Sequence, residues 1–314
     1  MQIIFMGTPD FAVGSLEALI EAGHTISLVV TQPDKKKGRG HAMQYPPVKE
    51  AAIAHKIPVW QPEKIREEAS IEYLEKIPAD VIVVVAFGQL IPKRILQMKP
   101  YGCINVHGSL LPKYRGAAPI QWAVIDGETE SGVTTMQMDE GLDTGDMLLK
   151  TVVPLEAKET GGSLFDKLSA AGAALCVETL RQLQEGTIHP EKQGESPTPY
   201  ASMLTKEMGE IDWTKDAISI ERLVRGLNPW PSAYTTLDGK ILKIWECEAL
   251  PGDASKAACG EILDVTKDSM TIQTGNGILS IKSLQLSGKK RMDIASFLRG
   301  TPLKKGIILS TNKL

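Results

Sequence analysis

Two polar residues, Asn105 and His107, stand two positions apart in a stretch that otherwise favours a buried strand. Residues two apart on a β-strand face the same side, so Ile104 and Val106 face the other side. The turn-forming residues that follow predict that the strand ends in a loop, where functional side chains of α/β folds gather. An amide beside an imidazole provides two hydrogen-bond donors for a developing oxyanion. This spacing therefore indicates acyl-transfer chemistry.

A third polar residue, Asp143, lies in the stretch 136–145. Gly141 and Gly145 flank it and allow the backbone unusual conformations. A carboxylate brought close to His107 by the fold would set the protonation state of the imidazole. No Ser or Cys stands in a nucleophile-elbow sequence, so we predict direct transfer without a covalent intermediate.

The composition predicts a soluble globular protein. The chain has 314 residues, of which 42% are hydrophobic and 23% charged, and its length favours two domains. The overall charge of −3 is distributed unevenly: residues 1–207 hold 20 Lys and Arg against 26 Asp and Glu, and residues 208–314 hold 15 against 12. A basic C-terminal third indicates either a polyanionic partner or an ordinary solvated surface.

Cysteine and histidine usage argues against a metal site. The four cysteines lack metal-ligand spacing and the five histidines are scattered along the chain. Such cysteines are typical of a reducing cytoplasm, where thiols pack as small apolar side chains. The apolar start of the chain is too short and uncharged for a signal peptide, and no run is long enough to cross a membrane. We expect a cytoplasmic protein without a metal, a membrane contact or an obligate protein partner.

The first two-thirds of the chain alternate between strand-like and helix-like runs. Residues 81–86 form a continuous β-branched run, which predicts a central strand buried on both faces. The alternation predicts an α/β fold, with a mostly parallel sheet and helices on both faces. The expected strands are 3–6, 26–31, 58–60, 81–86, 103–107 and 133–138, and the expected helices are 11–22, 47–55, 71–77, 92–98, 121–126 and 162–186.

The last third has a different pattern. Residues 187–204 contain three prolines and few apolar residues, which indicates a linker. A helix is expected at 218–227, followed by short strands at 241–245, 261–265, 270–274 and 277–282. Short strands separated by Gly-containing turns predict a small β-barrel.

Two further stretches are open to more than one interpretation. Residues 34–41, DKKKGRGH, form a basic run that is either a solvated loop or a flexible phosphate-binding loop. Residues 7–11, GTPDF, follow the first strand and could contact a phosphate. They lack the glycine spacing of a dinucleotide site, so a tight turn is favoured and a nicotinamide enzyme is not.

Five motifs together resemble one family. The stretches 105–116, NVHGSLLPKYRG, and 136–146, MQMDEGLDTGD, are similar to the two signatures of 10-formyltetrahydrofolate-dependent formyltransferases. Three further features resemble the methionyl-tRNA formyltransferases within that family. They are the start of the chain, the glycines around Arg39 and the stretch 228–231, NPWP. The resemblance covers essentially the whole chain. It implies a Rossmann-like catalytic domain at 1–189, a linker at 190–207 and an OB-like tRNA-binding barrel at 208–314.

The resemblance also implies an activity and a set of site residues. A formyl group would pass from 10-formyltetrahydrofolate to the α-amine of methionyl initiator tRNA. Asn105, His107 and Asp143 match the catalytic positions of the family. The folate-binding loop is matched by Ser109, Leu110, Leu111 and Pro112, and the basic residues expected at the tRNA acceptor end are Lys35, Lys36, Lys37 and Arg39.

Three other functions are compatible with parts of this pattern, and one of them is a folate-dependent deformylating hydrolase. A formyl-folate enzyme could act on a small amine, such as a purine precursor or an amino sugar, although the linker and barrel argue against the purine enzyme. A non-catalytic RNA-binding module could retain a folate pocket, although the intact Asn105, His107 and Asp143 argue against it.

Overall fold

The computed structural model describes residues 1–37, 42–252 and 257–310, which form two compact units. The first unit contains Met1–Pro119, Glu130–Pro154 and Phe165–Ala201, and the second contains Ile120–Thr129, Leu155–Leu164 and Ser202–Leu314. The units therefore interleave along the chain, whereas the expected domains are contiguous. The limits 1–189, 190–207 and 208–314 remain a prediction.

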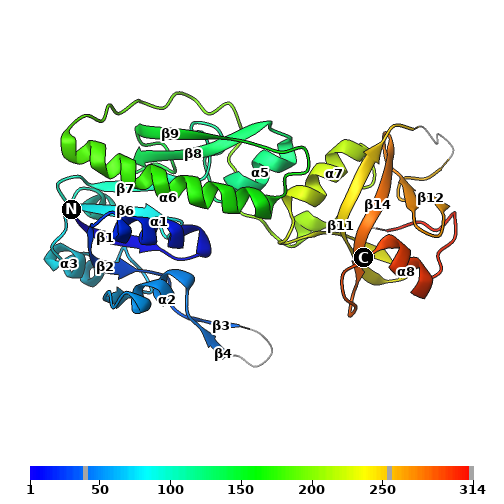
Figure 1. Cartoon of the computed structure of the whole chain (residues 1–314), viewed down its shortest axis with the longest axis horizontal. Helices are drawn as coiled ribbons and strands as arrows, with labels where there is room; N and C mark the ends of the chain where they lie inside the picture. The colour runs from blue at the N-terminus through cyan, green and yellow to red at the C-terminus, as the bar shows by residue number, and fades with distance from the viewer. Residues whose placement is uncertain (38–41, 253–256, 311–314) are drawn as a thin grey trace. The chain divides into compact units, whose positions relative to one another are not determined.

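The first unit is built on a twisted sheet, in which seven strands are seen within the described residues (Figure 1). Its order is β5-β2-β1-β6-β7-β8-β9. The strands from β5 to β7 are parallel, while β8 pairs antiparallel with both β7 and β9. The expected mostly parallel sheet is confirmed. Its strands are β1 Gln2–Gly7, β2 Thr25–Val30, β5 Val59–Trp60, β6 Val81–Val85, β7 Cys103–His107, β8 Glu130–Gln137 and β9 Met147–Pro154.

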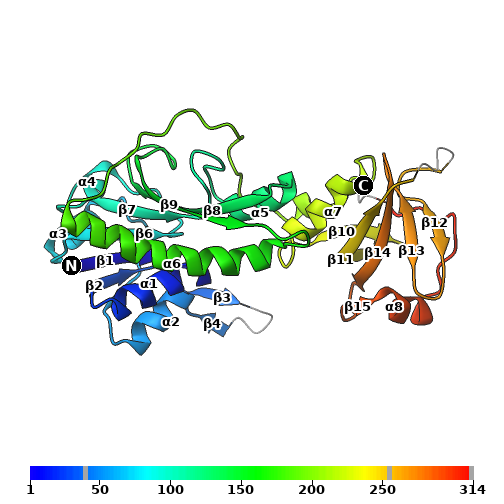
Figure 2. The same cartoon turned by 45° about the horizontal axis from the view of Figure 1, so that its top comes forward.

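Helices cover both faces of this sheet (Figure 2). On one face, α1 (Asp10–Glu21) contacts α6 (Gly161–Glu185) through the rings of Phe11 and Phe165, whose centroids are 5.3 Å apart. Gly172 of α6 lies against the sheet, because a Cβ there would be 3.1 Å from the side chain of Val106. On the other face, α3 (Glu68–Lys76) and α4 (Lys93–Leu96) cover an apolar cluster formed by Ile4, Met6, Leu28, Val30, Ile71, Leu74, Ile82, Val84, Ile95 and Cys103.

A short hairpin replaces part of the expected basic loop. Strands β3 (Lys35–Lys37) and β4 (Ala42–Gln44) pair with each other in a sheet of their own and extend away from the main sheet of the unit (Figure 1). The carboxylate of Asp34 at the base of the hairpin accepts hydrogen bonds from Lys49 on α2 (Pro47–Ala54) at 2.7 Å and from Gln61 at 2.8 Å. These bonds, Lys49 foremost, lower the pKa of Asp34 and attach the hairpin to the unit.

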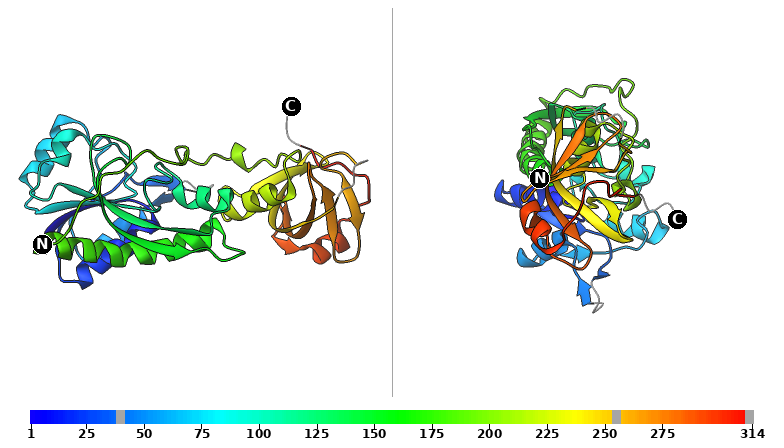
Figure 3. Two further views of the ribbon diagram at one scale, coloured as in Figure 1. Left: turned by 90° about the horizontal axis from the view of Figure 1, so that it is seen from above. Right: turned by 90° about the vertical axis from the view of Figure 1, so that its right-hand side faces the viewer.

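The second unit contains an antiparallel sheet that closes on itself (Figure 3). Its strands run in the order β10-β11-β14-β13-β12, and β15 pairs with β14. Residues 306–310 join the two edges: the Ile262 amide of β12 donates to the Ile307 carbonyl at 2.8 Å, and the Thr236 amide of β10 donates to the Ser310 carbonyl at 3.0 Å. The expected barrel is confirmed. Its strands are β10 Ala233–Leu237, β11 Lys240–Leu250, β12 Ile262–Val265, β13 Met270–Gln273, β14 Ile278–Leu286 and β15 Met292–Asp293.

Two helices of this unit begin at aspartate caps. Asp216 accepts a hydrogen bond from the Ser219 amide at 2.9 Å at the start of α7 (Ala217–Gly226), and Asp293 accepts one from Ser296 at 2.8 Å at the start of α8 (Ile294–Gly300). Such caps satisfy amides that have no partner within the helix. The hydrogen bonds lower the pKa of both carboxyls.

Short segments from the middle of the chain complete the second unit. α5 (Pro119–Asp126) packs against α7, since a Cβ on Gly226 would lie 2.4 Å from the side chain of Ile125. Arg225 donates to the carbonyl of Glu159 at 2.8 Å, and Gly162 donates to Asn228 at 2.9 Å. In the part of the chain that the structure describes, no helix has both the length and the hydropathy to span a membrane.

Candidate functional site

The strand β7 carries the first two predicted site residues. It pairs with β6 on one side and β8 on the other, so its backbone is hydrogen-bonded along both edges. Because Val106 points towards α6, Asn105 and His107 point to the opposite face of the sheet, as predicted. Both are buried, with exposed fractions of 8% and 6%. The side-chain amide of Asn105 makes no hydrogen bond to any described residue, which leaves its N–H groups free to act as donors.

The imidazole of His107 is oriented by the loop that follows the strand. Nε2 lies 3.0 Å from the carbonyl oxygen of Tyr114. A carbonyl can only accept, so Nε2 carries a proton and donates it to this bond. Nδ1 faces Asp143, at 3.8 Å from Oδ1. The structure therefore brings His107 and Asp143 together and identifies Nδ1 as the ring nitrogen not bonded to the backbone.

The backbone holds Asp143 in an uncommon conformation. The residue lies in the loop between β8 and β9 with a φ of 56°, in the left-handed region that non-glycine residues seldom occupy. Its Oδ2 accepts a hydrogen bond from the Gly116 amide at 2.9 Å. Gly145 is required nearby, because a Cβ there would lie 1.8 Å from the carbonyl oxygen of Gln137.

The loop 109–112, predicted to bind folate, is held in shape by hydrogen bonds to Thr134 on β8 and to Lys113. The hydroxyl of Thr134 on β8 accepts from the Leu111 amide at 3.0 Å and donates to the Ser109 carbonyl at 2.7 Å. Ser109 in turn donates from its hydroxyl to the Lys113 carbonyl at 2.7 Å. The side chains of Ser109 and Leu111 are fully buried, so they support the loop, whereas Leu110 and Pro112 are half-buried. Pro112 follows a cis peptide bond.

The segment 191–201 contributes to the site although it was predicted only as a linker. The Ala201 amide donates to the Arg115 carbonyl at 2.7 Å, and the Tyr114 amide donates to the Thr198 hydroxyl at 2.7 Å. The Gln193 amide contacts the loop of Asp143. Sequence reasoning missed these residues because they attach by hydrogen bonds and not by an apolar pattern. The sequence feature that could have indicated a role for this segment is the presence of Gln193 and Tyr200, two large polar side chains in a proline-containing stretch.

Tyr200 lies at the border of this site. A Cβ on Gly116 would be 2.9 Å from its ring, while the ring itself is half exposed. Burial and the charge of Asp143 raise the pKa of the Tyr200 hydroxyl. The phenol therefore stays protonated near Asp143 and can donate a hydrogen bond.

Comparisons with known proteins identify the family. Residues 1–180 match the family described as formyl transferase, and residues 203–302 match the formyl transferase C-terminal domain. The chain belongs to the formyl transferase family. It is 61% identical to the methionyl-tRNA formyltransferase of Agathobacter rectalis over 98% of each chain. It is 57% identical to that of Lachnospira eligens, over 98% of this chain and 99% of the relative.

Solved structures share the fold of this formyl transferase. An N-formyltransferase from Helicobacter canadensis, solved with folinic acid and dTDP-3-aminofucose, superposes with a TM-score of 0.68 at 17% identity. The alignment covers 92% of this chain and 99% of that protein. At this identity the likeness supports the fold alone.

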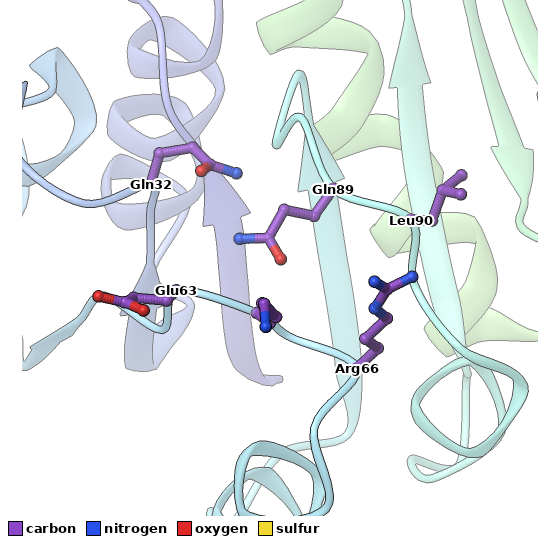
Figure 4. A pocket seen from close by; sticks show the side chains of 6 residues that line it. Gln32, Glu63, Arg66, Gln89 and Leu90 are labelled. Atoms are coloured by element: carbon purple, nitrogen blue, oxygen red, sulfur yellow. The ribbon is translucent and has the colours of Figure 1, made fainter.

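A cavity of about 280 Å³ lies beyond the carboxyl ends of the parallel strands of the formyl transferase. It is next to the point between β1 and β6 where the strand order reverses, a usual place for ligands in open α/β sheets. Gln32 and Gln89 point towards one another across it, and Arg66 extends towards Leu90 (Figure 4). Lys64 and Glu63 also line the cavity, so its wall is polar and carries charges of both signs. Sequence analysis did not predict these residues.

Three of the predicted tRNA contacts belong to the β3–β4 hairpin and not to the sheet that contains β7. Lys35 is exposed on β3, and Lys36 and Lys37 continue the same strand. Arg39 lies outside the described residues. Within the described ranges, no group of three or more His, Cys, Asp or Glu side chains is arranged to hold a metal ion.

Proposed function

We propose that this formyl transferase moves the formyl group of 10-formyltetrahydrofolate to the α-amine of methionyl initiator tRNA, giving formylmethionyl-tRNA for translation initiation. The observation that carries the proposal is the 61% identity, over 98% of both chains, to a methionyl-tRNA formyltransferase. The polar group around β7 supplies side chains suited to this reaction. Tetrahydrofolate and tRNA are then the two partners of the site.

The reaction proceeds by direct attack of the neutral amine on the formyl carbon. A bond forms between the amine nitrogen and the formyl carbon, the bond from that carbon to the folate nitrogen breaks, and one proton passes from the amine to the folate. Negative charge collects on the formyl oxygen in between. In our proposal Asn105 and protonated His107 donate to that oxygen. The unbonded amide of Asn105 and the free Nδ1 side of His107 support these roles.

In this scheme the charge of Asp143 keeps His107 protonated, so that its Nδ1–H can donate to the formyl oxygen, and Asp143 assists proton transfer either directly or through a water. The 3.8 Å separation between Asp143 Oδ1 and His107 Nδ1 supports an electrostatic partnership. The bond from Gly116 to Oδ2 keeps one carboxylate oxygen in place while the other faces the imidazole.

Folate contacts are assigned to the loop Ser109, Leu110, Leu111 and Pro112. Its hydrogen bonds to Thr134 on β8 support a preformed surface beside His107. Because Ser109 and Leu111 are buried, the loop would contact folate through its backbone and through Leu110 and Pro112.

Contacts with tRNA are assigned to the basic residues Lys35, Lys36, Lys37 and Arg39 and to the barrel of the C-terminal domain, 208–314. The net positive charge of residues 208–314 supports this assignment. On the barrel, the cationic groups of Lys243 and Arg291 lie 5.6 and 5.3 Å from the ring centre of Trp245. Cations beside an aromatic ring suit a phosphate backbone with unstacked bases.

A formylation assay tests the proposal. Purified protein is supplied with 10-formyltetrahydrofolate and Met-tRNA of the initiator or the elongator type. We expect transfer to the initiator species, lost in His107→Ala and retained in His189→Ala, which alters an exposed histidine. Absence of transfer to either tRNA by folded protein would contradict the proposal and direct the search to small-amine acceptors.

A further inference from the structure

We infer that Gln193 is a positioning residue of the active site, because its amide joins the loop of Asp143 to the loop that orients His107. The segment 191–201 is then part of the catalytic machinery and not only a connection between two units. The tests of this inference that measure formyl transfer rest on the proposed function. The test that measures the ring signals of His107 does not.

Both ends of the Gln193 amide are used. Nε2 donates to the carbonyl oxygens of Asp143 at 2.9 Å and Gly145 at 2.7 Å. Oε1 accepts from Nε of Arg115 at 2.9 Å, and the same guanidinium donates to the Gly194 carbonyl at 2.8 Å. Two carbonyls on one side and a cation on the other require a side chain that both donates and accepts. A primary amide satisfies all three partners at once.

These bonds form a closed ring around Asp143. Gln193 holds the backbone carbonyl of Asp143, Arg115 holds Gln193, and the next residue, Gly116, holds the Asp143 carboxylate at 2.9 Å. The main chain of Asp143 is therefore held by Gln193, which Arg115 positions, and its side chain is held by Gly116, the residue after Arg115. Its φ of 56° is unfavourable for a residue with a side chain, so the conformation depends on the contacts that hold it.

The segment reaches this position independently of Gln193. Glu191 exchanges two backbone hydrogen bonds with Met147 at 2.8 Å, and Ala201 pairs with Arg115 at 2.7 Å. Thr198 accepts from the Tyr114 amide at 2.7 Å. These contacts lie on both sides of Gln193, so the segment stays attached when the amide alone is removed. Substitution of Gln193 then tests the position of Asp143 and not the attachment of the segment 191–201.

The first test replaces the amide by an apolar chain of similar length. Gln193→Met should lower kcat for formyl transfer on the order of 10-fold to 100-fold, as expected for a small displacement of a catalytic group. KM for both substrates should change by less than about threefold, because binding groups are untouched. Gln182→Met, which removes one amide bond to Glu178 on α6, is the matched control and should retain wild-type kcat.

A carboxylate at position 193 distinguishes the bond to Arg115 from the two bonds to the loop of Asp143. Gln193→Glu keeps an acceptor for Arg115 but faces the carbonyls of Asp143 and Gly145 with negative charge. We expect a loss of kcat at least as large as for Gln193→Met. Wild-type activity in Gln193→Glu would show that the bonds to the Asp143 loop are not needed, and would overturn the inference.

A double-mutant cycle tests whether Gln193 acts through Asp143. In the Asp143→Ala background, adding Gln193→Met should lower kcat by no more than about twofold, because the group to be positioned is already absent. The full loss of the single variant, repeated in that background, would mean that Gln193 acts by another route and would refute the inference.

Ring ¹⁵N signals of His107 provide the readout that needs no activity, assigned by their loss in His107→Ala. In Gln193→Met these signals should move towards their positions in Asp143→Ala, while Gln182→Met leaves them unchanged. Unchanged His107 signals in Gln193→Met would overturn the inference. Failure of the wild-type protein to formylate tRNA would contradict only the proposed function, since the ring signals still report on the position of Asp143.

Discussion

The region around β7 and the surface of the barrel use polar side chains in opposite ways. Asn105 and His107 are buried, and fixed backbone groups hold His107 and Asp143. On the barrel, Lys243 and Arg291 lie outside an apolar interior, near the Trp245 ring. Stabilising charge on one atom requires donors fixed in a site that excludes water. Attracting a phosphate backbone requires exposed charge whose effect depends on salt. Substitutions around β7 should therefore change turnover, whereas substitutions on the barrel should change tRNA affinity and its dependence on salt.

The largest effects are expected at the buried group. Asn105→Ala, His107→Ala and Asp143→Ala should each lower turnover on the order of 10²–10³-fold, because each removes a donor or the group that charges it. Single-turnover formylation measures the loss, and circular dichroism checks that the fold is intact. Turnover near that of the wild type in all three variants would show that the buried group is not the catalytic one.

An intermediate effect is expected at Arg39. Arg39→Ala should raise the tRNA concentration required for half-maximal rate and weaken the preference for initiator over elongator tRNA, with little change in folate affinity. Formylation kinetics on both tRNAs, with exposed Lys56→Ala as the control, measure this. A change confined to folate affinity would exclude the role assigned to the basic run.

A smaller and salt-dependent effect is expected on the barrel. The double variant Lys243→Ala and Arg291→Ala should weaken tRNA binding without changing kcat at saturating tRNA. The slope of log affinity against log salt should become shallower by about 1 for each phosphate that the variant no longer binds. Filter-binding titrations at several salt concentrations give the slope. An unchanged slope would place the tRNA elsewhere on the chain.

The smallest effect on catalysis is expected from the helix cap of α7. Asp216→Ala should lower the free energy of unfolding by about 0.5–2 kcal/mol. Because folding lowers the pKa of Asp216, the cap stabilises fully above the unfolded value of 3.8 and its contribution is lost as pH falls through the folded value. Thermal unfolding of wild type and variant should therefore converge in acid. Asp264→Ala, on the exposed face of β12, is the control.

Local patterns predicted the elements that carry the site. The alternation around Asn105 and His107 identified both the strand and the shared face, and the β-branched run identified β6 as fully buried. These features follow from short-range periodicity, which sequence displays directly. The approach of Asp143 to His107 depends on how the fold brings two separate loops together, which no local pattern shows. Asp143 was included because of its flanking Gly141 and Gly145 and because of the motif resemblance. The structure places the two together.

Features held by hydrogen bonds were not predictable in this way. The segment 191–201 attaches through Gln193, Thr198 and backbone groups, so it has no apolar pattern to reveal its position. The edge-joining residues 306–310 were missed for the same reason, because their bonds are made by the backbone. Strands β9 and β10 were also missing from the expected elements.

The interleaving of the two units limits how this protein can be recombined. A single crossover between Ala201 and Ser202 would transfer the barrel without Leu155–Leu164, which contains the carbonyl bound by Arg225 and the glycine bonded to Asn228. It would also leave behind Ile125, which packs on Gly226. A chimera that exchanges barrels between relatives must therefore exchange three stretches of coding sequence together. In this chain the second unit, unlike its barrel strands, is not encoded by one continuous stretch of sequence.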